Sequence, residues 1–116
     1  MKISVIVCAH DEERFIAGCV ASLLAQTRTP DEILVINNAS GDRTGAIAAS
    51  FPGVRVVDEP RKGLVMARER GRHEAVGDLL VYMDADCRAP IRWLAHIERH
   101  FERQPQALQA HADCPS

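Results

Sequence analysis

The most constraining feature of this sequence is an unbroken apolar run that ends in two carboxylates. Leu79–Met83 follows the break Gly77-Asp78 and precedes Asp84-Ala85-Asp86. A short apolar run between turn residues is typical of a strand that is buried on both faces of a parallel sheet. Where the chain turns out of the sheet, two carboxylates at this spacing can face one hard cation. The pattern therefore indicates a divalent metal site that carries phosphate.

Strands and helices are expected to alternate along the chain. Further strands are predicted over residues 3–8, 32–37 and 54–58. Helices are predicted around residues 15–24, 44–50, 64–76 and 90–104. Asp11 is the expected N-cap of the first helix. Short connections between alternating elements predict an α/β fold, a Rossmann-like parallel sheet of about four strands with helices on both faces.

Polar side chains stand where each predicted strand ends. They occupy residues 10–13, 37–42, 58–63 and 84–88. In open parallel sheets, ligands bind outside the carboxyl ends of the strands, where the strand order reverses. We therefore expect these side chains to converge on one crevice.

Composition, charge and the lengths of the apolar runs indicate the class of protein. The net charge of −2 and the 26% of charged residues are ordinary for a globular protein and do not favour general nucleic-acid binding. We expect one domain over residues 1–105, followed by a tail, 106–116, that begins a missing acceptor-binding region. The sequence carries no signal-peptide core and no apolar run near the ~18 residues of a membrane span, which predicts a cytoplasmic protein. The cysteines lack CxxC spacing, so reduced thiols are expected.

The acidic pair and a basic segment favour the same ligand. Two close carboxylates repel each other unless a cation bridges them, and bound Mg²⁺ or Mn²⁺ takes phosphate oxygens in its other positions. Five basic residues follow the third strand: Arg61, Lys62, Arg68, Arg70 and Arg72. Lys62 precedes a helix N-terminus and is the best placed to reach a diphosphate. The alternative is a solvated helix face with ion pairs to neighbouring glutamates.

Two further positions have both a functional and a structural interpretation. Asn37 and Asn38 end the second strand, and their amides could read a nucleobase edge or could form a turn and cap the next helix. His10 ends the first strand, where it could stack on a base or bind a metal, or serve a structural role.

The order of these motifs resembles glycosyltransferase family 2 over about residues 3–103. The matching stretches are Ser4–Val7 with His10-Asp11-Glu12-Glu13, Ser22–Thr27, Glu32–Thr44, Lys62-Gly63 with Ala67-Arg68, and Gly77-Asp78 with Asp84-Ala85-Asp86. The resemblance implies the nucleotide-binding half of the GT-A fold.

The resemblance also implies a set of site residues. Those implied to bind the nucleotide sugar are Cys8, Ala9, His10, Glu12, Asn38, Lys62, Gly63, Arg68, Asp84 and Ala85. Asp84-Ala85-Asp86 would be the DxD motif, with Asp86 as the principal ligand of Mn²⁺ or Mg²⁺ and Asp84 beside it. The ion would stabilise charge on the leaving diphosphate.

The implied activity is a hexosyltransferase-like transfer from a UDP- or GDP-sugar to an unknown acceptor. The family usually has an aromatic residue and Asn where this chain has His10-Asp11, and commonly Asp at Asn38, so the base stays open. The general base is expected beyond Ser116, with no catalytic residue in this chain, and the chain alone is expected to be inactive. A peripheral membrane association of the full-length enzyme belongs to the same set of expectations.

Two other functional classes stay open. Acids after the first strand and Asp58 at the end of the third resemble part of a receiver-like phosphoacceptor domain. A nonenzymatic interaction module would pair through an open sheet edge and form a homodimer.

Overall fold

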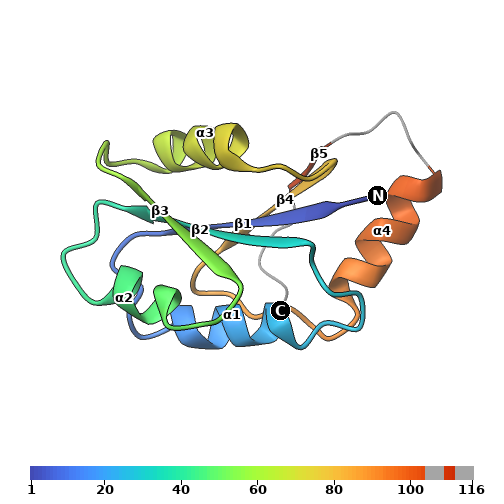
Figure 1. The fold of residues 1–116 in the computed structure, drawn as a ribbon, viewed down its shortest axis with the longest axis horizontal. Helices are drawn as coiled ribbons and strands as arrows, with labels where there is room; N and C mark the ends of the chain where they lie inside the picture. Colours follow the sequence, from blue (N-terminus) through green and yellow to red (C-terminus); the bar gives the residue numbers. More distant parts are fainter. Residues whose placement is uncertain (104–108, 112–116) are drawn as a thin grey trace.

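The computed structural model describes residues 1–103 and the backbone of residues 109–111. Its elements follow in the order β1 (Ile3–Ala9), α1 (Ile16–Leu24), β2 (Glu32–Asn38), α2 (Thr44–Ala49), β3 (Val54–Glu59), α3 (Leu64–Glu74), β4 (Leu79–Asp84), α4 (Trp93–Arg103) and β5 (Gln109–His111) (Figure 1). The α/β alternation expected from the sequence is confirmed.

The sheet has the strand order β3-β2-β1-β4-β5, and all four strand pairs are parallel. The chain moves outward from β1 to β3 and then crosses back to place β4 on the other side of β1. The strand order therefore reverses between β1 and β4, which is where ligands bind in such sheets. β5 lies within the predicted tail and adds a fifth strand to the four that were expected.

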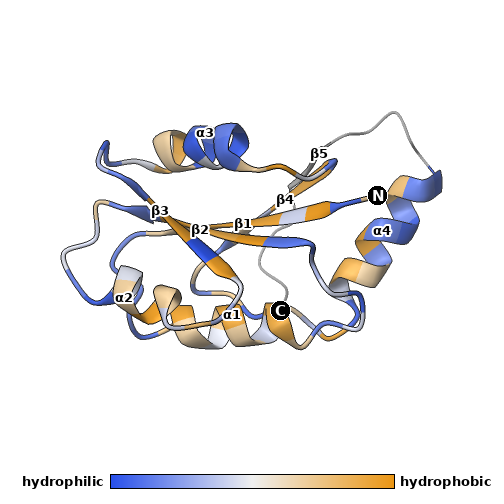
Figure 2. Ribbon diagram, viewed as in Figure 1, coloured by the Kyte–Doolittle hydropathy of each residue, from blue (hydrophilic) through white to orange (hydrophobic). Residues whose placement is uncertain are grey.

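The helices cover both faces of the sheet. Figure 1 shows α3 on one face and α1 and α2 on the other. Alternate strand residues supply the two cores, since Val5 and Val7 pack with α1 whereas Ile6 packs with Ala67 of α3. Figure 2 shows apolar stretches in the central strands and along α1 and α2, whereas much of α3 is hydrophilic. This is the side-chain alternation of a strand that is buried on both faces.

The start of α1 differs from the prediction. The helix begins at Ile16, and no side chain caps it. Asp11 has a positive φ of 52° and its Oδ1 accepts a hydrogen bond from the Gly41 amide at 2.7 Å. Asp11 tolerates this left-handed conformation because its short side chain bonds to nearby backbone. The prediction that Asp11 is the N-cap of this helix is therefore wrong, because Asp11 instead joins the loop after β1 to the loop after β2.

Ser22 of α1 and Gln26, two residues after that helix ends, hold the segment that follows β4. Gln26, which is 6% exposed, donates to Pro90 O at 2.7 Å and accepts from the Leu94 amide at 3.0 Å. Ser22 Oγ accepts from the Ala89 amide at 2.9 Å. Buried polar groups that are satisfied in this way fix the backbone they contact. The segment between β4 and α4 is thereby tied to α1.

Within residues 1–103 and 109–111, no helix combines the length and the apolarity that a bilayer crossing requires.

Candidate functional site

A cavity of about 390 Å³ opens at the carboxyl ends of β1 and β4, where the strand order reverses. Its volume falls within the ~300–1,000 Å³ that is usual for small-molecule sites. It is lined by Cys8, Ala9, His10, Glu12, Asn38, Lys62, Gly63, Leu64, Ala67, Asp84, Ala85 and Asp86. The segments after β1, β2, β3 and β4 thus meet at one place, as parallel strands require.

Ten of the lining residues are site residues predicted from the sequence. Arg68 is the predicted residue that does not line the cavity. Burial raises the pKa of the Cys8 thiol, and the nearby positive charge of Arg68 opposes part of that rise. Leu64 and Ala67 line the cavity but were not among the predicted site residues. They lie one and four positions after Gly63, and this helical spacing puts them on the same side of α3.

Asp84 is the last residue of β4, and Asp86 lies in the turn that follows. Asp84 is opposite Cys8 in the β1–β4 register. Asp84 and Asp86 are exposed, whereas Ala85 between them is only 2% exposed and belongs to the core. The turn out of the sheet therefore leaves both carboxylates exposed while Ala85 packs into the core. Oxygen atoms of Asp84 and Asp86 and the sulfur of Cys87 lie within 4.8 Å of one another.

The cysteines divide into free thiols and one disulfide half. Cys87 is disulfide-bonded, so the expectation of reduced thiols is wrong for this residue. A disulfide sulfur is not a thiolate and makes a poor metal ligand. Cys8 and Cys19 are free. Of the described cluster, two carboxylates are left, and hard oxygen donors suit Mg²⁺ or Mn²⁺.

A third carboxylate lies close to this pair. The Glu12 amide donates to Thr44 Oγ1 at 2.9 Å, which fixes the start of the segment after β1. Desolvation raises the pKa of the Glu12 carboxyl, and the charges of Asp86, Asp42 and Asp84 raise it further. This end of the cavity is therefore strongly negative and would favour a cation.

The basic segment is mostly paired. Arg61 Nη2 lies 2.8 Å from Glu59 Oε1, and Arg72 Nη2 lies 2.7 Å from Glu69 Oε1. For these two arginines the ion-paired alternative is correct. Lys62 instead lines the cavity, directly before Gly63 and the N-terminus of α3. Gly63 has a backbone φ of 132°, a value that residues with a side chain rarely adopt, so the turn into α3 requires glycine.

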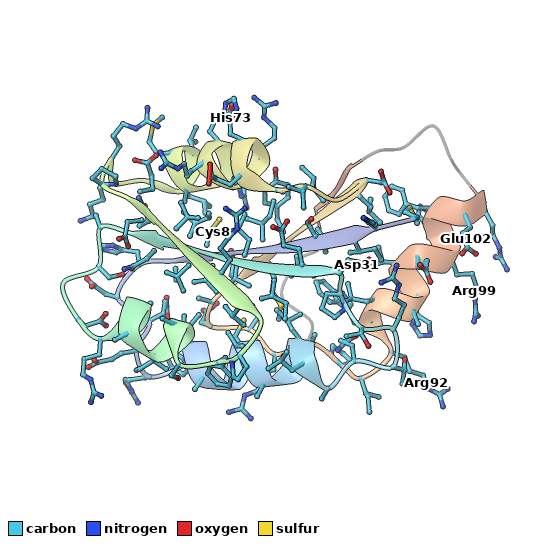
Figure 3. The ribbon with its side chains drawn as sticks, in the orientation of Figure 1. Cys8, Asp31, His73, Arg92, Arg99 and Glu102 are labelled. Carbon is cyan, nitrogen blue, oxygen red and sulfur yellow. The ribbon has the colours of Figure 1, made fainter. Side chains whose placement is uncertain are left out.

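His10 and Asn38 connect two walls of the cavity. His10 Nδ1 lies 2.7 Å from Asn38 O, and because a carbonyl only accepts, Nδ1 carries the proton. Asn38 is 4% exposed, and its amide bonds to the backbone of the loop after β3. In Figure 3, Cys8 lies between the sheet and α3, whereas His73 points away from the sheet on the outer side of that helix.

The model of the family described as Glycosyl transferase family 2 matches residues 4–114. The chain belongs to this family. The uncharacterized glycosyltransferase EpsJ of Bacillus subtilis strain 168 is 35% identical over 88 residues, which are 72% of this chain and 26% of EpsJ. The glucosyl-dolichyl phosphate glucuronosyltransferase of Haloferax volcanii is 26% identical over 114 residues, which are 93% of this chain and 36% of that enzyme.

Solved structures of glycosyltransferases share the fold. TarS 1–349 of S. aureus in complex with UDP has a TM-score of 0.81 and 23% identity, over 89% of this chain and 32% of that chain. The Mycobacterium tuberculosis glucosyl-3-phosphoglycerate synthase, in complex with Mn²⁺, UDP and phosphoglyceric acid, has a TM-score of 0.66 and 27% identity, over 75% of this chain and 34% of that chain. The GT-A fold expected for this family 2 chain is confirmed. The chain spans only about a quarter to a third of these proteins.

Proposed function

We propose that this chain is the donor-binding part of a glycosyltransferase and binds a nucleotide diphosphate sugar with a divalent cation. The observation that carries the proposal is the cavity at the β1–β4 reversal, which Asp84 and Asp86 line together with Lys62. A metal-bound diphosphate needs oxygen ligands for the cation and a positive group for its remaining charge. The UDP and Mn²⁺ bound by the Mycobacterium tuberculosis relative support this assignment.

Asp86 is proposed as the principal metal ligand, with Asp84 beside it. Their exposed carboxylates are hard oxygen donors that suit Mn²⁺ or Mg²⁺, and Glu12 adds negative charge nearby. When bound, the ion would supply positive charge that stabilises the leaving diphosphate.

The remaining walls would bind the rest of the donor. The Lys62 ammonium and the positive end of the α3 dipole complement phosphate oxygens. Ala9, Leu64 and Ala67 give an apolar surface against which a nucleoside can pack and from which water is excluded. Transfer to the acceptor is proposed for the whole protein, because the chain spans only 26–36% of the length of the two relatives described.

Calorimetric titration of UDP and GDP, each with and without Mn²⁺, tests the proposal. We expect binding of at least one nucleotide to depend on the metal and Asp86→Ala to weaken it by about tenfold or more, since a charged ligand is lost. Asp58→Asn is the matched control, because Asp58 also lies near the carboxyl end of a strand but accepts a bond from Asn37 at 3.2 Å outside the cavity. The proposal fails if folded protein binds neither nucleotide, or if Asp86→Ala binds as the wild type does.

A further inference from the structure

We propose that Asn38 and Glu59 are positioning residues that hold the loop Glu59–Gly63 against the cavity, so that Lys62 and Gly63 form its wall. This inference rests on the proposed function, because the wall matters for activity only if a nucleotide binds there. It gives Asn38 a role different from reading a nucleobase and adds Glu59, which the sequence did not single out.

Both polar atoms of the Asn38 side chain form hydrogen bonds with the backbone of residues 59–63. Nδ2 donates to Glu59 O at 3.0 Å and to Arg61 O at 2.8 Å, and Oδ1 accepts from the Gly63 amide at 2.9 Å. Because the two carbonyls only accept and the amide only donates, a flipped carboxamide would oppose all three contacts. At 4% exposure the amide has both donors used and lies away from solvent.

Glu59 anchors the same loop from the other side. Its carboxylate accepts from the Arg61 amide at 2.9 Å, from Arg61 Nε at 3.1 Å and from Arg61 Nη2 at 2.8 Å. Arg70 Nη1 of α3 lies 3.9 Å from the same carboxylate. The bonds from the Arg61 side chain and amide lower the pKa of Glu59 to about 2. Glu59 is only 1% exposed, and an ionised carboxylate that is so buried needs such partners. The bonds that satisfy the carboxylate therefore also fix the position of Arg61.

These contacts pin Lys62 on both sides. The peptide groups of Arg61 and Gly63 are held by Asn38 and Glu59, and Lys62 lies between them. The link continues across the cavity, since Asn38 O is the partner of His10 Nδ1 at 2.7 Å. The loop that carries Lys62 is therefore fixed by two buried side chains, Asn38 in the cavity lining and Glu59 outside it.

Asn38→Asp separates the positioning role from base recognition. The change preserves size and the acceptor for the Gly63 amide, but it removes both donors and sets a carboxylate against two carbonyl oxygens. If Asn38 positions the loop, affinity for every nucleotide should fall together. If Asn38 reads the base, the ratio of UDP affinity to GDP affinity should change.

The experiment measures UDP and GDP affinity in Mn²⁺ by calorimetry, and Mn²⁺ affinity alone by electron paramagnetic resonance. We expect Asn38→Asp and Glu59→Gln to weaken nucleotide binding by about tenfold or more, with an unchanged UDP-to-GDP ratio and an unchanged Mn²⁺ affinity. Glu74→Gln is the control, since Glu74 pairs with Arg55 at 3.2 Å at the far end of α3. A changed ratio, wild-type nucleotide affinity in both variants, or a parallel loss of Mn²⁺ affinity would overturn the proposal.

Hydrogen exchange of the free protein separates this proposal from the proposed function. We expect both variants to exchange amides of residues 59–64 faster than the wild type, with residues 42–50 unchanged. Faster exchange in a protein that binds no nucleotide would support the positioning role of Asn38 and Glu59 while the proposed function fails. Unchanged exchange in residues 59–64 would refute that positioning role whatever the nucleotide data show.

Discussion

Gly71 packs closely against the sheet from α3, and its replacement by alanine tests how tightly that helix packs. A Cβ at Gly71 would lie less than 3.0 Å from Ile6 Cγ2 and 3.5 Å from Ile36 Cγ1. Both isoleucines are fully buried in the strands below α3. Because a close-packed core has no space for an added methyl group, either the helix or the strand has to move to accommodate it.

The magnitude follows from two opposing effects. Alanine in a helix interior is favoured over glycine by ~1 kcal/mol. Overpacking costs ~1–3 kcal/mol, and full burial of Ile6 puts this site at the upper end. We therefore expect Gly71→Ala to lower the free energy of unfolding by roughly 1–2 kcal/mol, with a fall in Tm of about 5–10 °C.

Urea unfolding followed by circular dichroism measures this change. Gly41→Ala is the control, since a Cβ there would meet nothing within 4 Å, and we expect its stability to stay within about 0.5 kcal/mol of the wild type. A Gly71→Ala protein as stable as the wild type, or more stable, would refute the reasoning, because helix propensity would then outweigh the contact with Ile6.

Two further predictions concern ionisable groups. The lowered pKa of Glu59, about 2 against 4.5, adds stability above pH 4.5 that is lost as the pH falls towards 2. The stability difference between wild type and Glu59→Gln, from urea unfolding, should therefore shrink over that range, and a constant difference would contradict it. Burial raises the pKa of the Cys8 and Cys19 thiols to about 11 and about 12. Iodoacetamide at pH 8, read by mass spectrometry, should label Cys8 roughly 200-fold and Cys19 roughly 2,000-fold more slowly than an exposed thiol, and rapid labelling of folded protein would contradict this.

Much of the fold follows from local pattern and chain topology. The apolar run before Asp84 could only be a buried strand, and parallel pairing then forces the segments after each strand to one edge of the sheet. This is why Lys62 and Asp86, which lie far apart in the sequence, line one cavity. β5 was not among the four strands predicted with defined bounds, because three residues are too few for a periodic signal.

Side-chain direction was less predictable than position. Aspartate is a residue type favoured at N-caps, yet the positive φ of Asp11 turns its side chain to Gly41. This contact depends on the separate loop after β2. Asn38 was placed correctly at the cavity, but its amide points to carbonyls of a loop more than twenty residues later. Such directions depend on tertiary neighbours that no local pattern encodes.

The bonds from Ser22 and Gln26 mean that the segment after the acidic pair is held by a part of the chain more than sixty residues earlier. A graft of residues 84–94 onto another scaffold would carry the carboxylates but leave behind the acceptor and donor groups that bind the backbone of Ala89, Pro90 and Leu94. A transplant of the proposed cation site should therefore include residues 16–26. Conversely, substitutions at Ser22 or Gln26 would change the hold on this segment without altering Asp84 or Asp86.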